Sequence, residues 1–167
     1  MGASVRLVLL RPIDEAEFLA AVARSRKLHG PWVSPPTTRA AFQALAARSQ
    51  GPNNFGFAVR DATTDALVGF IDITNIVRGV FLSAYLAYYA FTGHEQQGLM
   101  RAGLRLAVRK AFTELKLHRL EANIQPGNLP SIALVRSCGF EQEGYSPRYL
   151  KIRGRWRDHE RWAIVAR

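Results

Sequence analysis

The sequence contains a single cysteine, Cys138, among its 167 residues. One cysteine excludes an internal disulfide framework, and it excludes zinc or iron–sulfur sites that need several cysteine ligands. His94 and His159 lack metal-ligand spacing, so we expect no metal site. A chain without internal disulfides suits a reducing compartment, and we expect the protein to be cytoplasmic.

Long hydrophobic runs are absent as well, since no apolar stretch reaches the length of a membrane-spanning helix. Residues 1–15 include a short apolar stretch, but the cleavage pattern of a signal peptide does not follow it. We therefore expect a soluble protein that is not exported and has no membrane partner.

Acidic residues are scarce: 13 Asp and Glu stand against 23 Lys and Arg, which gives a net charge of +10. Such an excess favours anionic partners, including nucleotide phosphates, nucleic acid and ribosomal surfaces. Residues 81–167 hold fourteen basic and seven acidic side chains, against nine and six in residues 1–80. We expect anions to bind mainly in the C-terminal half.

The remaining composition is that of a folded chain, with 48% apolar and 22% charged residues. The length matches one domain, and we find no repeats, low-complexity tracts or linkers, so residues 1–167 are expected to form a single domain.

Hydrophobic periodicity and turn residues predict the order of the elements. Strands are expected at residues 5–10, 55–60, 66–73, 81–91 and 118–124, from residue 140, and in a hairpin of residues 149–152 and 156–166. Helices are expected from Asp14, from Thr37 or Thr38 to about residue 50, over residues 98–115, and from Asn128 to Ser137. The order β-α-α-β-β-β-α-β-α-β-β is that of a mixed α/β (α+β) layer architecture.

The junction between the strand at residues 81–91 and the helix that begins at Gly98 is the first candidate site. Unpaired amides in the first turn of a helix suit a phosphate, and a glycine there lets the backbone approach it closely. A glycine at such a junction is more often explained by turn geometry alone.

Several short motifs in register resemble the GNAT acyl-CoA N-acyltransferase superfamily, and within it the RimJ-like ribosomal-protein-alanine N-acetyltransferases. The resemblance covers nearly the whole chain. It rests on residues 6–7, 31–32, 75–81, 85–86, 97–100, 121–123, Asn128 with Ser131, 139–140, 143–145 and 154–159.

This resemblance implies a mostly antiparallel, twisted sheet flanked by helices, with acetyl-CoA as co-substrate and no metal. It implies transfer to a protein N-terminus, that of a ribosomal protein beginning with alanine, by a monomer or homodimer. The residues it assigns to acetyl-CoA are Tyr88, Tyr89, Ala90, Phe91, Gln96, Gln97, Gly98, Leu99, Met100, Arg101, Asn128 and Ser131.

The chain departs from the family pattern at two positions. Glu95 stands where the acetyl-CoA loop has glutamine or arginine, and it adds a negative charge near the diphosphate, which Arg101 would offset. Val135 stands where many relatives carry a tyrosine that acts as general acid. Ser131 lies one helical turn earlier and is the candidate donor to the leaving thiolate; helping to cap the helix is its alternative role.

The resemblance also assigns residues to the amine substrate and to a general base. Asn123 aligns with the position where some relatives carry a glutamate base. Glu121 lies on the same face of the strand, and it is either a general base or an ordinary exposed carboxylate. Trp32, Tyr85 and Tyr149 are candidate substrate contacts, with packing in the core or on the sheet as the alternative.

Two other functions stay open at this stage. One is acetylation of a small-molecule or peptide amine, such as an antibiotic. The other is a non-catalytic module that binds the ribosome or nucleic acid through a cluster of basic residues. The alternative is that these side chains form a solvated face of the C-terminal hairpin. The basic cluster comprises Arg148, Lys151, Arg153, Arg155, Arg157 and Arg161.

Overall fold

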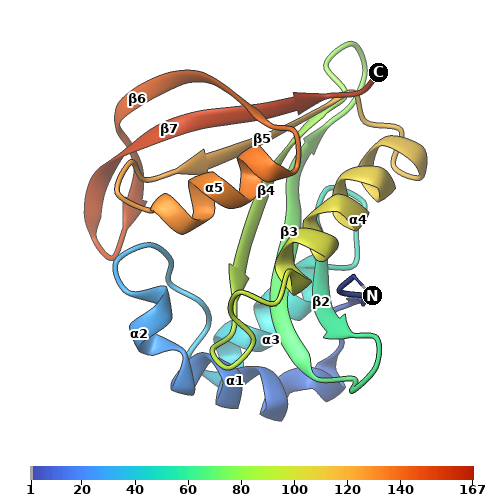
Figure 1. Ribbon diagram of the computed structural model, residues 1–167, viewed down its shortest axis with the longest axis vertical. Helices are drawn as coiled ribbons and strands as arrows, with labels where there is room; N and C mark the ends of the chain where they lie inside the picture. Colours follow the sequence, from blue (N-terminus) through green and yellow to red (C-terminus); the bar gives the residue numbers. More distant parts are fainter. Residues whose placement is uncertain (1) are drawn as a thin grey trace.

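A seven-stranded sheet runs through the computed structural model, which describes residues 2–167 (Figure 1). Its strands are β1 (Val5–Leu9), β2 (Phe55–Asp61), β3 (Leu67–Val77), β4 (Ser83–Ala90), β5 (Arg119–Ile124), β6 (Glu141–Ile152) and β7 (Arg155–Val165). The helices are α1 (Glu15–Arg24), α2 (Arg26–His29), α3 (Arg39–Arg48), α4 (Leu99–Thr113) and α5 (Leu129–Ser137), with a 3-10 turn η1 (Pro12–Asp14).

The strands lie in the order β1-β2-β3-β4-β5-β7-β6, and every neighbouring pair is antiparallel except β4 with β5. Those two strands are joined through α4, the kind of long connection that a parallel pair needs. The predicted mixed, mostly antiparallel sheet is confirmed. The pattern missed η1 and the four-residue α2, and it divided β6, which is one strand with two irregularities in its pairing with β7.

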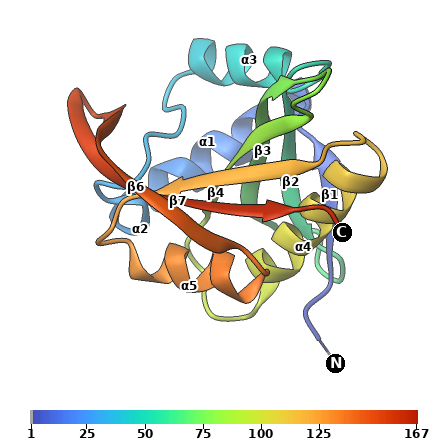
Figure 2. The same ribbon diagram turned by 90° about the horizontal axis from the view of Figure 1, so that it is seen from above.

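The helices cover both faces of the sheet (Figure 2). One core lies under α4 and α5 and includes Ile71, Leu104 and Val135, all fully buried. A second core lies under α1 and α3, where Phe18, Phe42 and Phe91 are fully buried and Phe18 packs against both of the other rings. Because side chains alternate along a strand, β3 and β4 supply residues to both cores.

The parallel pair β4–β5 is short. Only Ser83, Ala84 and Tyr85 of β4 pair with β5, and the last pair joins Tyr85 to Glu121. Beyond it β4 continues to Ala90 and β5 to Ile124 without pairing with each other, and the two ribbons diverge in Figure 1. The sheet therefore opens between its two central strands.

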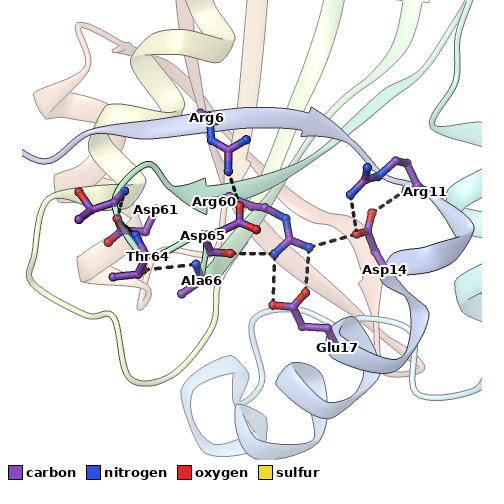
Figure 3. A network of polar contacts seen from close by, with 10 residues as sticks. Arg6, Arg11, Asp14, Glu17, Arg60, Asp61, Thr64, Asp65 and Ala66 are labelled. Atoms are coloured by element: carbon purple, nitrogen blue, oxygen red, sulfur yellow. Dashed lines mark hydrogen bonds and ion pairs between the residues drawn. The ribbon is translucent and has the colours of Figure 1, made fainter.

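A buried charge cluster ties β2 to the first helices (Figure 3). The Arg60 guanidinium is 8% exposed and donates to both carboxylate oxygens of Glu17, at 3.2 and 2.8 Å, and to Asp14 Oδ1 at 3.0 Å. It also donates to the Asp65 carbonyl at 2.9 Å. A buried charge is tolerated when its hydrogen bonds are made, as they are here.

Replacing Asp14 by alanine should leave the buried Arg60 with one partner fewer and should cost about 3 kcal/mol of unfolding free energy. The matched control is Arg6→Ala, which removes the exposed Arg6–Asp65 ion pair shown in the same view and should cost less than about 1 kcal/mol. Urea unfolding of both variants measures the difference, and equal losses would contradict the structural role given to Asp14.

Candidate active site

The opening between β4 and β5 leads into a cleft of about 750 Å³. The sheet residues of β3, β4 and β5 form its floor, while residues 32–36, α3, α5 and β6 contribute its walls. The cleft thus connects the diverging strands with the face of the sheet that carries α1 and α3.

Backbone groups of β4 face this opening. The Phe91 amide donates to the Val68 carbonyl of β3 at 2.9 Å, and hydrogen bonding alternates along an antiparallel pair. The amides and carbonyls of Leu86, Tyr88 and Ala90 therefore point away from β3. Free amides of this kind can polarise a carbonyl oxygen and stabilise negative charge that develops on it.

His29 closes the far end of the opening. Its Nε2 lies 2.7 Å from the Ala90 carbonyl oxygen, and the ring is 4% exposed. Burial lowers the pKa of His29, which favours the neutral ring that donates from Nε2. The Ala90 carbonyl is thereby occupied, while the amides of Leu86, Tyr88 and Ala90 still point toward the opening.

Tyr88 and Ser131 meet inside the cleft. The Tyr88 hydroxyl lies 2.6 Å from Ser131 Oγ and 3.2 Å from the Ser131 carbonyl oxygen. Burial raises the pKa of Tyr88, so the phenol stays protonated and can donate. When Tyr88 donates to Ser131 Oγ, the serine proton is free for a third atom.

Asn128 caps α5 through its side chain, whose Oδ1 accepts from the Ser131 amide at 3.4 Å. The Ser131 hydroxyl is therefore not the capping group, and it projects toward Tyr88 instead. Val135 is fully buried one turn later and offers no polar atom.

The N-terminus of α4 presents unpaired amides, although none of residues 96–101 lines the cleft. Gly98 caps this 15-residue helix with φ of 75°, a left-handed conformation that favours glycine, and Gln96 also has positive φ. The first-turn amides of Leu99, Met100 and Arg101 have no partner within the helix. A Cβ on Gly98 would lie 3.9 Å from Arg101 Nη2, so this guanidinium adjoins the same turn. Amides, helix dipole and arginine together suit a diphosphate.

Glu95 turns back into its own loop. Its carboxylate accepts from the Gly93 amide at 2.7 Å and from Thr92 Oγ1 at 2.9 Å. Hydrogen bonds from its own amide, Thr92 and Gly93 lower the pKa of this exposed carboxyl, which therefore remains charged beside the anion site.

The structure does not bring every predicted site residue to the cleft. Phe91 is fully buried among aromatic rings and its amide is used by Val68, so it offers no group to a ligand. Glu121 is paired with Arg119 at 3.1 Å and does not line the cleft, whereas its neighbour Asn123 does. Tyr89 borders the cleft while packing against Phe91.

All three residues assigned to the amine substrate, Trp32, Tyr85 and Tyr149, line the cleft. Trp32 adjoins the loop that precedes α5, since a Cβ on Gly127 would lie 3.2 Å from its ring. Gln125 Nε2 donates to the Pro31 carbonyl at 3.1 Å and holds the same segment. Burial, followed by the Tyr85 hydroxyl, raises the pKa of Tyr149.

Sequence reasoning missed one polar pair in the cleft. Asp72 Oδ2 of β3 accepts from Arg48 Nη2 of α3 at 3.0 Å, and Asp72 is 5% exposed. The available signal was a single carboxylate within the apolar run of β3, whose neighbours Ile71 and Ile73 are fully buried.

Within residues 2–167 there is no group of three or more His, Cys, Asp or Glu side chains that could hold a metal ion. In the same range no helix is both long enough and apolar enough to cross a bilayer.

Comparison with known proteins defines the class. The GNAT acetyltransferase domain model matches residues 6–141, most of the chain, and the protein belongs to this family of acetyltransferases, whose co-substrate is acetyl-CoA. A solved structure of Mycobacterium smegmatis RimJ in complex with CoA-disulfide superposes with a TM-score of 0.88 at 28% identity, covering 97% of this chain and 82% of that one.

Two curated relatives are similar in sequence. The probable N-acetyltransferase YjcK of Bacillus subtilis is 36% identical over 118 residues, which cover 71% of this chain and 65% of the relative. The ribosomal protein uS5-alanine N-acetyltransferase of Escherichia coli is 38% identical over 111 residues, which cover 66% of this chain and 57% of the relative. The match thus spans somewhat under two thirds of each relative's length.

Replacing Gly98 by tryptophan should weaken CoA binding at least about tenfold, because the side chain would cover the free amides of the α4 N-terminus. Gly79→Trp is the matched control, since Gly79 has φ of 76°, against 75° for Gly98, and open space around it. Calorimetric titration with CoA measures both variants. Equal binding in the two variants would place the diphosphate elsewhere.

Proposed function

We propose that this protein is a cytoplasmic enzyme that transfers the acetyl group of acetyl-CoA to the N-terminal α-amine of a protein, in particular a ribosomal protein that begins with alanine. The observation that carries the reaction is the opening between β4 and β5, where the Tyr88 amide and the Tyr88–Ser131 hydroxyl pair lie together. The 38% identity to an enzyme that acetylates ribosomal protein uS5 supports the choice of amine substrate.

The reaction needs little covalent participation by the protein. The neutral amine attacks the thioester carbon, so that the C–N bond forms, the C–S bond breaks and the bonding electrons pass to sulfur. An α-amine titrates near pH ~8, so a useful fraction is neutral without a strong base. Positioning of the two substrates then supplies much of the rate.

Residues of the opening complete the chemistry. The Tyr88 amide donates to the thioester oxygen as negative charge builds on it. Ser131 passes its proton to the departing sulfur and regains one from water, while Tyr88 orients the serine. The amine nitrogen gives its proton to the water that reprotonates Ser131, and the sulfur gains one proton, so the step is balanced.

Partner recognition in this proposal uses the β6–β7 hairpin. Arg148, Lys151, Arg153 and Arg155 are exposed, whereas Arg157 and Arg161 are half-buried and Arg161 donates to Ser146 Oγ at 3.1 Å. The six basic residues therefore do not form one solvated face. The four exposed ones suit an acidic surface of the ribosome or of a ribosomal protein.

Replacing Ser131 by alanine should lower kcat by about a hundredfold and leave acetyl-CoA affinity nearly unchanged, because a contact made only as the thiolate departs affects the rate. Ser137→Ala is the matched control: Ser137 lies in the same helix, and its hydroxyl donates to the Leu134 carbonyl at 2.7 Å and lies 4.0 Å from Cys138 Sγ, away from the cleft. Steady-state kinetics under conditions where chemistry limits turnover provide the test. Similar kcat in both variants would exclude Ser131 as the proton donor.

The amine substrate is tested by incubating the protein with labelled acetyl-CoA and the cell's own ribosomal proteins, with mass spectrometry to map the modified site. We expect label on an N-terminal alanine. A panel of small primary amines runs in parallel, and label confined to those amines would overturn the protein substrate. Label on internal lysines would overturn the α-amine assignment.

A further inference from the structure

Asp72 is a buried carboxylate with one oxygen unused. Oδ2 accepts from Arg48, but Oδ1 is buried and has no hydrogen-bond partner in the described part of the chain. Asp72 lines the cleft and is 5% exposed. Leaving a buried acceptor unpaired is unfavourable, and more so for a charged group, which points to a donor supplied from outside the chain.

Asn123 carries a second buried oxygen of this kind. Its Oδ1 also has no partner within residues 2–167, and it lines the same cleft. Both atoms are hydrogen-bond acceptors, so a ligand that satisfies both must bring at least two N–H or O–H groups.

The strand register places these two residues at the same level of the sheet. Asp72 pairs directly with Ala87 of β4. Ala87 lies two residues beyond Tyr85, and Asn123 lies two residues beyond Glu121, the partner of Tyr85 in the last β4–β5 pair. Asp72 and Asn123 therefore stand on either side of Ala87, where the strands part.

The three side chains also share one face. Asp72 reaches Arg48 of α3, and Ala87 lies on the face opposite to its neighbour Tyr88, which contacts α5. Asn123 lies opposite to Ala122, which is buried in the core under α4 and α5. The methyl group of Ala87 is small, so it leaves room above the strand between the two oxygens.

We propose that Asp72 Oδ1 and Asn123 Oδ1 bind the N–H groups of the amine substrate above Ala87. This inference rests on the proposed function and adds the groups that recognise the amine. A primary amine supplies the two donors that this pair of oxygens requires, whereas a single hydroxyl supplies one. The Tyr88 amide, which faces the thioester oxygen, belongs to the residue next to Ala87, so the amine is held beside the carbonyl that it attacks.

The test is Asp72→Asn. Arg48 donates to residue 72, so the asparagine must present its amide oxygen to Arg48 and its NH₂ group in the position of Oδ1. A donor then faces the amine. We expect KM for the amine substrate to rise about tenfold or more, with KM for acetyl-CoA unchanged.

Two further variants separate recognition from structure. Arg48→Met removes the ion pair but keeps Oδ1, and it should raise KM for the amine less than Asp72→Asn does. Asp65→Asn makes the same chemical change in the exposed turn before β3, where φ of 61° suits asparagine, and KM should not change. Equal effects of Arg48→Met and Asp72→Asn would show that Asp72 is only the structural partner of Arg48 and would overturn the proposal.

Binding without turnover provides a second readout. A peptide with N-terminal alanine and its desamino counterpart are titrated into the CoA-saturated protein. The unchanged protein should prefer the amine peptide, and Asp72→Asn should abolish that preference. If the protein acetylates only small amines, the proposed protein substrate fails, while the effect of Asp72→Asn on KM of those amines still decides this inference. A preference for the amine peptide that survives in Asp72→Asn overturns the inference. If the unchanged protein shows no preference between the peptides, the inference is overturned when Asp72→Asn leaves KM for the small amines unchanged.

Discussion

The site depends on how few residue pairs join β4 to β5. β4 pairs with β3 along nearly its whole length, and every residue of β5 pairs with β7. Only three residue pairs join these two parts of the sheet directly. Strand pairing satisfies backbone groups, so where pairing ends, the amides and carbonyls of β4 must find another partner. One carbonyl, that of Ala90, is paired with His29, and the amides of Leu86, Tyr88 and Ala90 point into the opening.

Two buried charges show how structural and functional roles differ in this molecule. Arg60 is surrounded by oxygen acceptors from Asp14, Glu17 and Asp65, and its position joins β2 to α1 and η1. Asp72 is just as buried, but its partner Arg48 occupies only one of its two oxygens. A fully satisfied charge stabilises the fold, whereas a half-satisfied one in a cleft retains an interaction for a ligand.

The sequence allowed the strands, the long helices and the Asn128 cap to be predicted, because each depends on local periodicity or on a capping residue. It did not reveal α2, which is only four residues long, or the continuity of β6, where Pro147 and the positive φ of Arg148 interrupt the pattern but only shift the pairing. The Tyr88–Ser131 contact and the free oxygen of Asp72 join residues far apart in the chain. Such contacts follow from packing, which no local pattern encodes.

The segment over the cleft has consequences for how this architecture diversifies. Residues 31–38 contain no helix or strand, and they are held to the rest of the molecule by Gln125 and by the contact of Trp32 with Gly127. The N-terminus of α4, whose free amides suit a diphosphate, involves none of these residues. Natural selection can therefore change the length or the side chains of this segment to admit a different amine. The N-terminus of α4 stays the same.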